Sequence, residues 1–173
     1  QDGYSVKSAA GQASHYYSQP FFRLSGTLTL PGGAVPVTGT AWLDREWSSQ
    51  PLAGDQRGWD WFSLSFDDGN KLMGFVLRGA ADYTAATWIA ADGQATPLAD
   101  GAFTATPLVR HGVAGRQVPT TWQVSLPARG VDVTVTAMNP DAWMQTSVPY
   151  WEGPVTITGS HTGVGYLEMT GHD

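Results

Sequence analysis

The residues of this chain that could perform acid–base chemistry are carboxylates placed among tryptophans. Successive side chains of a β-strand point to opposite faces, so the segment 42–47 puts Trp42, Asp44 and Glu46 on one face. An apolar surrounding disfavours the ionised form of a carboxyl group and lets it keep a proton near neutral pH. Such an acid, beside aromatic rings that stabilise a cation, is what protonation of a carbon–carbon double bond requires.

Asp60 is a further candidate acid. It alternates with apolar residues as far as Phe66, so it shares a strand face that is otherwise large and apolar. A bare carboxylate on such a face is costly to bury, and it must be paired, hydrogen-bonded or protonated. Arg45 and Arg57 are the nearest cations in the sequence and are the expected partners. A paired Asp60 is structural, whereas a protonated Asp60 could transfer a proton.

Tryptophans are dense around these acids. The chain has eight, and we single out five that lie in or near the acidic segments: Trp42, Trp47, Trp59, Trp61 and Trp151. Rings of this size either fill a core or line an apolar cavity for a hydrophobic ligand. Both interpretations stay open, because a lipocalin-like cavity is a core with a hole in it.

The remaining composition argues against several other classes of function. A net charge of −6 without runs of like charge gives no footprint for nucleic acid or anionic lipid. Cysteine is absent, and the four histidines are far apart and match no metal-binding spacing. No stretch approaches the roughly 18 apolar residues of a membrane helix. We therefore expect no metal, no cofactor, no nucleic-acid partner and no membrane span.

The elements that must position these residues are strands. Alternating apolar residues predict about ten of them and no helix, with Asp-Gly hairpin turns at 68–69 and 92–93. The expected strands are 15–30, 35–47, 59–67, 71–78, 83–91, 95–98, 103–109, 122–126, 131–138, 150–161 and 165–170, with a loop over 111–119. Sequential hairpins favour an antiparallel, lipocalin-like β-barrel with room for one small ligand, and a two-sheet sandwich is the alternative.

The first fourteen residues differ from the rest in composition. Residues 1–14 are small and polar, which is typical of a linker or an arm that reaches another domain. We expect this arm to be extended and poorly packed on its own barrel. The domain organisation is then an arm at 1–14 followed by a barrel domain at 15–173.

Four segments resemble one protein family. The stretch GTAWLDREWSSQPLAGDQRGWDWFSLSFDDGNKLMGFVLR (39–78) is similar to the signature of the AttH-like family related to carotenoid 1,2-hydratase (hydroxyneurosporene synthase). The segments ASHYYSQP (13–20), YWEGPVTITGS (150–160) and GVGYLEMTG (163–171) agree with it in family order. The family pairs two lipocalin-like barrels, and this match is to the second. The resemblance implies an N-terminal barrel as partner, joined through 1–14, in a secreted or periplasmic bacterial protein.

The resemblance also implies a site. The positions that match the family motif are Asp44, Glu46, Trp47, Gln56, Trp59, Asp60 and Trp61. We expect Asp60, Asp44 and Glu46 to be catalytic, and Trp42, Trp47, Gln56, Trp59, Trp61 and Trp151 to bind the ligand. Two positions depart from the hydratase branch: Arg45 stands where that branch has histidine, and no acid lies between Asp68 and Asp82.

Two hypotheses of function follow. The chain is either a module that binds an isoprenoid, carotenoid or lipid-like ligand, or a cofactor-independent hydratase, lyase or cyclase that acts on an alkene or polyene by acid catalysis. They are distinguished by whether Asp60, or Asp44 with Glu46, points into a cavity or at an arginine.

Overall fold

The computed structural model describes residues 3–49 and 52–172, and these are almost entirely strands and turns. The strands are β1 (Tyr4–Val6), β2 (Ala13–Leu30), β3 (Gly33–Trp47), β4 (Gly58–Phe66), β5 (Lys71–Arg78), β6 (Tyr83–Ile89), β7 (Ala95–Leu98), β8 (Thr104–Val113), β9 (Arg116–Leu126), β10 (Val131–Ala137), β11 (Trp143–Met144), β12 (Tyr150–Gly159) and β13 (Gly163–Met169). Within the described ranges the one helical element is a 3-10 turn, η1 (Pro127–Arg129). No helix there is long and apolar enough to cross a membrane.

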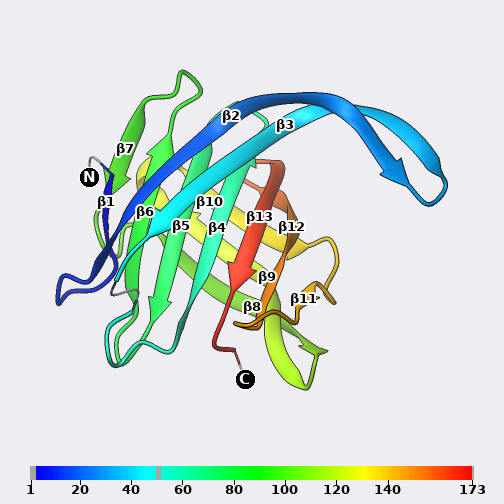
Figure 1. The fold of residues 1–173 in the computed structure, drawn as a ribbon. Coiled ribbons are helices and arrows are strands. Elements are labelled where there is room, and N and C mark those ends of the chain that lie inside the picture. Colours follow the sequence, from blue (N-terminus) through cyan, green and yellow to red (C-terminus); the bar gives the residue numbers. More distant parts are fainter. Residues whose placement is uncertain (1–2, 50–51, 173) are drawn as a thin grey trace.

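Ten of the strands form one curled antiparallel sheet. Its order is β7-β6-β5-β4-β13-β12-β10-β9-β8, with β11 paired to β12 (Figure 1). Both Asp-Gly pairs form the predicted turns, since β4 pairs with β5 and β6 with β7 in antiparallel register. The prediction of an all-β, antiparallel, lipocalin-like fold is confirmed.

The inner face of the curled sheet is a packed core. Phe62 and Leu64 of β4 lie there with Trp122 of β9, Trp151 of β12 and Leu167 of β13, and all five are at most 1% exposed. The rings of Phe62 and Trp122 meet edge to face with centroids 5.4 Å apart. Burial of these large side chains against one another holds the two halves of the curled sheet together.

The longest hairpin, β2 with β3, lies outside this core. Its base crosses the outer face of the main sheet, and its tip projects well beyond the sheet (Figure 1). Leu24, Leu28 and Leu30 near the tip are each about half exposed, at 46%, 53% and 51%. The apolar side chains whose alternation predicted this strand therefore have no apolar surface to pack against within the described part of the chain.

The predicted loop at 111–119 is wrong. Strand β8 runs to Val113, β9 begins at Arg116, and the two pair as a tight hairpin. The turn residues Ala114 and Gly115 both have positive φ, 51° and 77°. That geometry suits a two-residue hairpin, but it normally carries Asn-Gly or Asp-Gly, so the Ala-Gly pair gave no signal.

The expectation that the N-terminal arm packs poorly is also wrong for its described residues, 3–14. Strand β1 pairs with the start of β2, and Ser5, Lys7, Ser8 and Ser14 are buried. Backbone bonds close the turn, with Lys7 N donating to Gln12 O at 2.7 Å. Several of these buried polar side chains have partners: the Ser8 hydroxyl donates to Gln12, the Ser14 hydroxyl donates to Glu46, and Lys7 forms an ion pair with Glu46.

Candidate functional site

The candidate site lies between the base of the β2–β3 hairpin and the outer face of the main sheet. The strand register sets Tyr16 opposite Glu46 and Ser18 opposite Asp44, so all four point to one side of the hairpin. Trp42 lies on the same face of β3, as the alternation predicted. Hairpin side chains of opposite parity, such as Trp47, point away.

The sheet contributes the facing wall. Trp61 of β4 pairs with Phe75 of β5 on one side and with Glu168 of β13 on the other, which aligns the three across the sheet. Trp59 lies two residues before Trp61 on the same outer face. Strands distant in the sequence thus bring aromatic rings and a further carboxylate opposite Asp44.

These two walls enclose a cavity, called here the carboxylate cavity. One part, of about 230 Å³, is lined by Tyr16, Asp44, Glu46, Trp59, Trp61, Phe75 and Glu168. It shares Asp44, Trp61 and Glu168 with an adjoining part of about 440 Å³, which also contacts Trp42, Glu152, Val164 and Tyr166. No arginine or lysine is among the described residues that line either part. The cavity therefore combines aromatic walls with several acidic groups.

Asp44 is the acid of the hairpin that faces the cavity without a cation. Its Oδ1 accepts a hydrogen bond from Trp42 Nε1 at 2.9 Å and another from the Ser18 hydroxyl. Burial raises the pKa of Asp44 above its ordinary value; hydrogen bonds from Ser18, Trp42 and Tyr16 oppose this effect, and the negative charge of Glu46 adds to it. Asp44 is thus placed to hold a proton that an exposed aspartate would lose.

Glu168 is a second such acid. Trp59 Nε1 donates to its Oε1 at 2.7 Å. Burial raises the pKa of Glu168, and the charges of Glu152, Glu46 and Asp44 raise it further. Glu152 lies directly opposite Glu168 in the β12–β13 pair, and this like charge disfavours ionisation of Glu168.

Glu46 has a different environment, because a lysine neutralises it. Lys7 Nζ lies 3.0 Å from Glu46 Oε1, and the Ser14 hydroxyl also donates to that oxygen. Lys7 is only 2% exposed, and burial lowers its pKa while Glu46 opposes that shift. Among the described residues that line the cavity, Glu46 is therefore the one carboxylate with a cationic partner, and Asp44, Glu152 and Glu168 have none in the structure.

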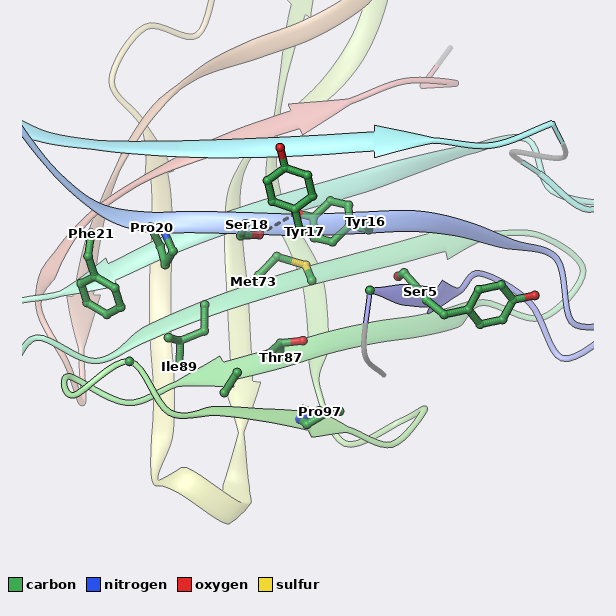
Figure 2. Close-up of a pocket in the computed structure, with 14 residues that line it drawn as sticks. Ser5, Tyr16, Tyr17, Ser18, Pro20, Phe21, Met73, Thr87, Ile89 and Pro97 are labelled. Atoms are coloured by element: carbon green, nitrogen blue, oxygen red, sulfur yellow. Dashed lines mark hydrogen bonds between the residues drawn. The ribbon is translucent and has the colours of Figure 1, made fainter.

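A second hollow adjoins the cavity on the other side of β2. This groove of about 530 Å³ lies between β2, which contributes Tyr17 and Phe21, and the main sheet, which contributes Met73, Thr87 and Ile89 (Figure 2). None of the described residues that line it carries a charge. The groove suits an apolar chain, in contrast to the carboxylate cavity.

Asp60 does not face either hollow. It is fully buried on the inner face of β4, where Arg78 Nε lies 3.0 Å from Oδ2 and His172 Nε2 lies 2.6 Å from Oδ1. The expected pairing with Arg45 or Arg57 is wrong. The neighbouring strand β5 supplies Arg78, two residues beyond Val76, which pairs with Asp60.

Three other predicted ligand-binding residues lie outside the cavity. Trp151 is fully buried in the core, and its Nε1 donates to Pro140 O at 2.9 Å. Trp47 is 52% exposed and stacks on His15, at the edge of a separate hollow beside Lys7. Gln56 bonds to backbone, donating to Lys7 O at 2.8 Å.

The structure thus brings together Trp42, Asp44, Glu46, Trp59 and Trp61, and their roles stay predictions. Sequence reasoning missed Lys7, Tyr16 and Glu168. Burial raises the pKa of Tyr16, so its hydroxyl stays protonated beside Asp44. The described residues contain no group of three histidine or acidic side chains placed to hold a metal ion.

Comparison with known proteins agrees with this architecture. The chain is similar to the crystal structure of an AttH protein from Nitrosomonas europaea, with 35% identity and a TM-score of 0.89, covering 100% of this chain and 57% of that one. It is also similar in fold to kievitone hydratase from Nectria haematococca, with 20% identity and a TM-score of 0.78, covering 96% of this chain and 55% of that one. No curated protein matches the sequence significantly.

The chain therefore spans little more than half the length of both solved structures. The profile of the AttH-like family matches residues 1–172, which is nearly the whole sequence. On this match and on the fold, the chain belongs to the AttH-like family.

Proposed function

We propose that the carboxylate cavity binds a hydrophobic, alkene-bearing molecule and adds water to its double bond by acid catalysis. The observation that carries this proposal is the setting of Asp44. It points into an aromatic cavity without a cationic partner, and burial raises its pKa. By the criterion stated from the sequence, an acid that faces a cavity rather than an arginine favours an enzyme.

The proposed reaction balances with side chains alone. The Asp44 carboxyl gives its proton to one alkene carbon, and the π electrons form the new C–H bond. The other carbon becomes a cation, which the faces of Trp42 and Trp61 stabilise. A water oxygen bonds to that carbon while the Glu46 carboxylate accepts the proton that water loses. An alcohol results, and return of the proton from Glu46 to Asp44, directly or through water, restores the site.

Two observations support an isoprenoid or carotenoid-like substrate. The uncharged groove shares Tyr16 and Pro20 with the cavity, so an apolar tail could extend from one hollow into the other. A structural relative is named a hydratase, which makes addition of water a reaction that this fold can carry. At 20% identity that likeness concerns the fold, and the substrate is proposed from the lining of the hollows.

A second candidate is binding without chemistry. The uncharged groove favours it, because an apolar chain could be held there without any contact to the acids. Both candidates need a ligand beneath the hairpin, and they differ in whether its double bond reaches Asp44.

The rest of the protein enters as a proposal as well. The exposed apolar residues of the hairpin tip, such as Leu24, Leu28 and Leu30, fit a contact with an N-terminal barrel. Both solved relatives have additional chain of the length such a barrel needs. Secretion or a periplasmic location stays a prediction.

The experiment uses the full-length protein and a panel of long-chain isoprenoid alkenes. Binding is measured by calorimetry, and product alcohol by mass spectrometry. Val164→Trp narrows the cavity from an exposed rim position, and Val148→Trp is the matched control at an exposed site outside the lining. We expect Val164→Trp to weaken binding about tenfold and to abolish product, with the control unchanged. Binding without product supports the second candidate, and absence of binding contradicts both.

A further inference from the structure

The position of Lys7 suggests which carboxyl group of the cavity accepts a proton and which ones hold one. Lys7 belongs to the N-terminal arm, and its side chain reaches the wall of the site under the hairpin. Its Nζ lies 3.0 Å from Glu46 Oε1 and 3.3 Å from the centroid of the Phe75 ring. An ammonium group buried to this extent is stable only with a carboxylate or aromatic partner, and Lys7 has both.

We propose that Lys7 is a positioning residue, which keeps Glu46 ionised as the proton acceptor and so leaves Asp44 and Glu168 to hold the protons. The proposal rests on the proposed function and deepens it, because it separates a base from the acids within one cavity. Lys7 acts through Glu46 and is not among the residues that line the parts of the cavity holding Asp44 and Glu168.

Among the described charged and titratable groups around Glu46, Lys7 is the cation. Asp44 lies two residues away on β3, Tyr16 is opposite on β2, and Glu168 approaches from β13. Strands β4 and β5 contribute uncharged rings, among them Trp59 and Phe75. Lys7 pairs with Glu46 and interacts more weakly with the charge of Asp44, whereas burial, with the negative charge of Glu46, disfavours ionisation of Asp44 and Glu168.

Several contacts fix Lys7 in this position. Gln56 Nε2 donates to Lys7 O at 2.8 Å, and Ala53 N donates to Gln56 Oε1 at 2.8 Å. Lys7 N donates to Gln12 O, which closes the turn that leads into β2. The family-motif residue Gln56 thus acts on the site indirectly, by holding the backbone that carries Lys7.

The chain offers a simple way to test this pairing without substrate. Its 173 residues contain two lysines, Lys7 and Lys71, so the signal that disappears in Lys7→Arg and the one that disappears in Lys71→Arg assign the two Cε signals in the full-length protein. Replacing Glu46 with Gln removes the anion next to Lys7. We expect the Lys7 Cε signal to titrate at clearly lower pH in Glu46→Gln than in the wild-type full-length protein, with Lys71 as internal control. A Lys7 titration that does not move would overturn the proposal.

The reciprocal variants test the effect on the base. In Lys7→Met, Glu46 has lost its cation, so Glu46→Gln should change the free energy of unfolding much less in the Lys7→Met background than in the wild type. Lys7→Arg keeps the charge and should restore the wild-type behaviour, and Lys71→Met should leave it unchanged. Equal behaviour of Lys7→Met and Lys7→Arg would contradict the proposal.

The same variants separate this inference from the proposed reaction. If hydration occurs, the acidic limb of its pH–rate profile should move to higher pH in Lys7→Met and return in Lys7→Arg. If the full-length protein hydrates alkenes but this limb does not move, the role of Lys7 is refuted and the hydratase proposal stands. If the Lys7 titration shifts as expected and no alkene is hydrated, the pairing stands and the hydratase proposal fails.

Discussion

A carboxylate next to the inner face of strand β4 and one next to its outer face have opposite surroundings. On the inner face, Asp60 is fully buried, forms an ion pair with Arg78 and is hydrogen-bonded to His172. On the outer face, Trp59 and Trp61 line a cavity in which Asp44 has indole and hydroxyl partners but no cation. Asp60 directly follows Trp59 and Asp44 stands two residues after Trp42, so the sequence around the two acids is similar, and the surrounding strands decide which one is ion-paired in the core and which one faces a cavity.

The largest expected effect is the loss of stability when the inner carboxylate is neutralised. Asp60→Asn leaves Arg78 and His172 without their anion, and breaking a buried pair in this way costs about 3 kcal/mol. Urea unfolding measures the change. Asp141→Asn removes a comparable Asp–His contact, His111 with Asp141, from the exposed surface and should cost less than about 1 kcal/mol. Equal losses in the two variants would show that burial does not distinguish Asp60.

On the outer face of the sheet, neutralising a carboxylate should raise the free energy of unfolding and not lower it. Burial and like charges raise the pKa of Glu168, so its protonated form is favoured in the folded state. The stability from this group is therefore present below its unfolded pKa and is lost as the pH rises through the folded value. Glu168→Gln should raise the free energy of unfolding at pH 7 by up to about 1 kcal/mol, after allowance for solvent screening.

The same gain should disappear at pH 4, where Glu168 in the wild-type chain holds a proton and resembles glutamine. Thermal unfolding at the two pH values tests this. A stabilisation that is the same at both pH values, or a loss of stability at pH 7, would mean that Glu168 is an ordinary ionised residue.

The smallest expected effect concerns the arm. Gln56→Ala removes the hydrogen bond to Lys7 O, and loss of one such bond costs about 1 kcal/mol. Amide hydrogen exchange should accelerate within residues 3–14 more than in the main sheet, because the arm is the element that this bond holds. Gln19→Ala, at an exposed position of β2, is the control. Uniform acceleration across the sheet would argue against a local role.

The sequence was sufficient for the fold class because most of its signals are local. Alternation predicted the strands, and the Asp-Gly pairs predicted two hairpins. Strand parity also placed Trp42, Asp44 and Glu46 on one face. These inferences need no knowledge of which strands meet.

The rest of the site depends on contacts between distant segments. Glu168 stands beside Trp61 only because β13 inserts between β4 and β12. Lys7 reaches Glu46 because the arm folds back on β2, although its polar composition is that of a linker. Asp60 was assigned to Arg45 or Arg57 by closeness in sequence, whereas pairing of β4 with β5 delivers Arg78. Such pairings are set by sheet order, which alternation within a strand does not report.

The most direct test of the central claim is incorporation of oxygen from ¹⁸O-labelled water into an isoprenoid alkene by the full-length protein. Asp44→Asn keeps the size and the hydrogen-bonding oxygen of the side chain but removes the acid. We expect Asp44→Asn to fold stably and to lose incorporation by about 10²-fold or more, with Asp141→Asn unchanged. Incorporation that is undiminished in a stably folded Asp44→Asn protein would contradict the assignment of the carboxylate cavity as the catalytic site.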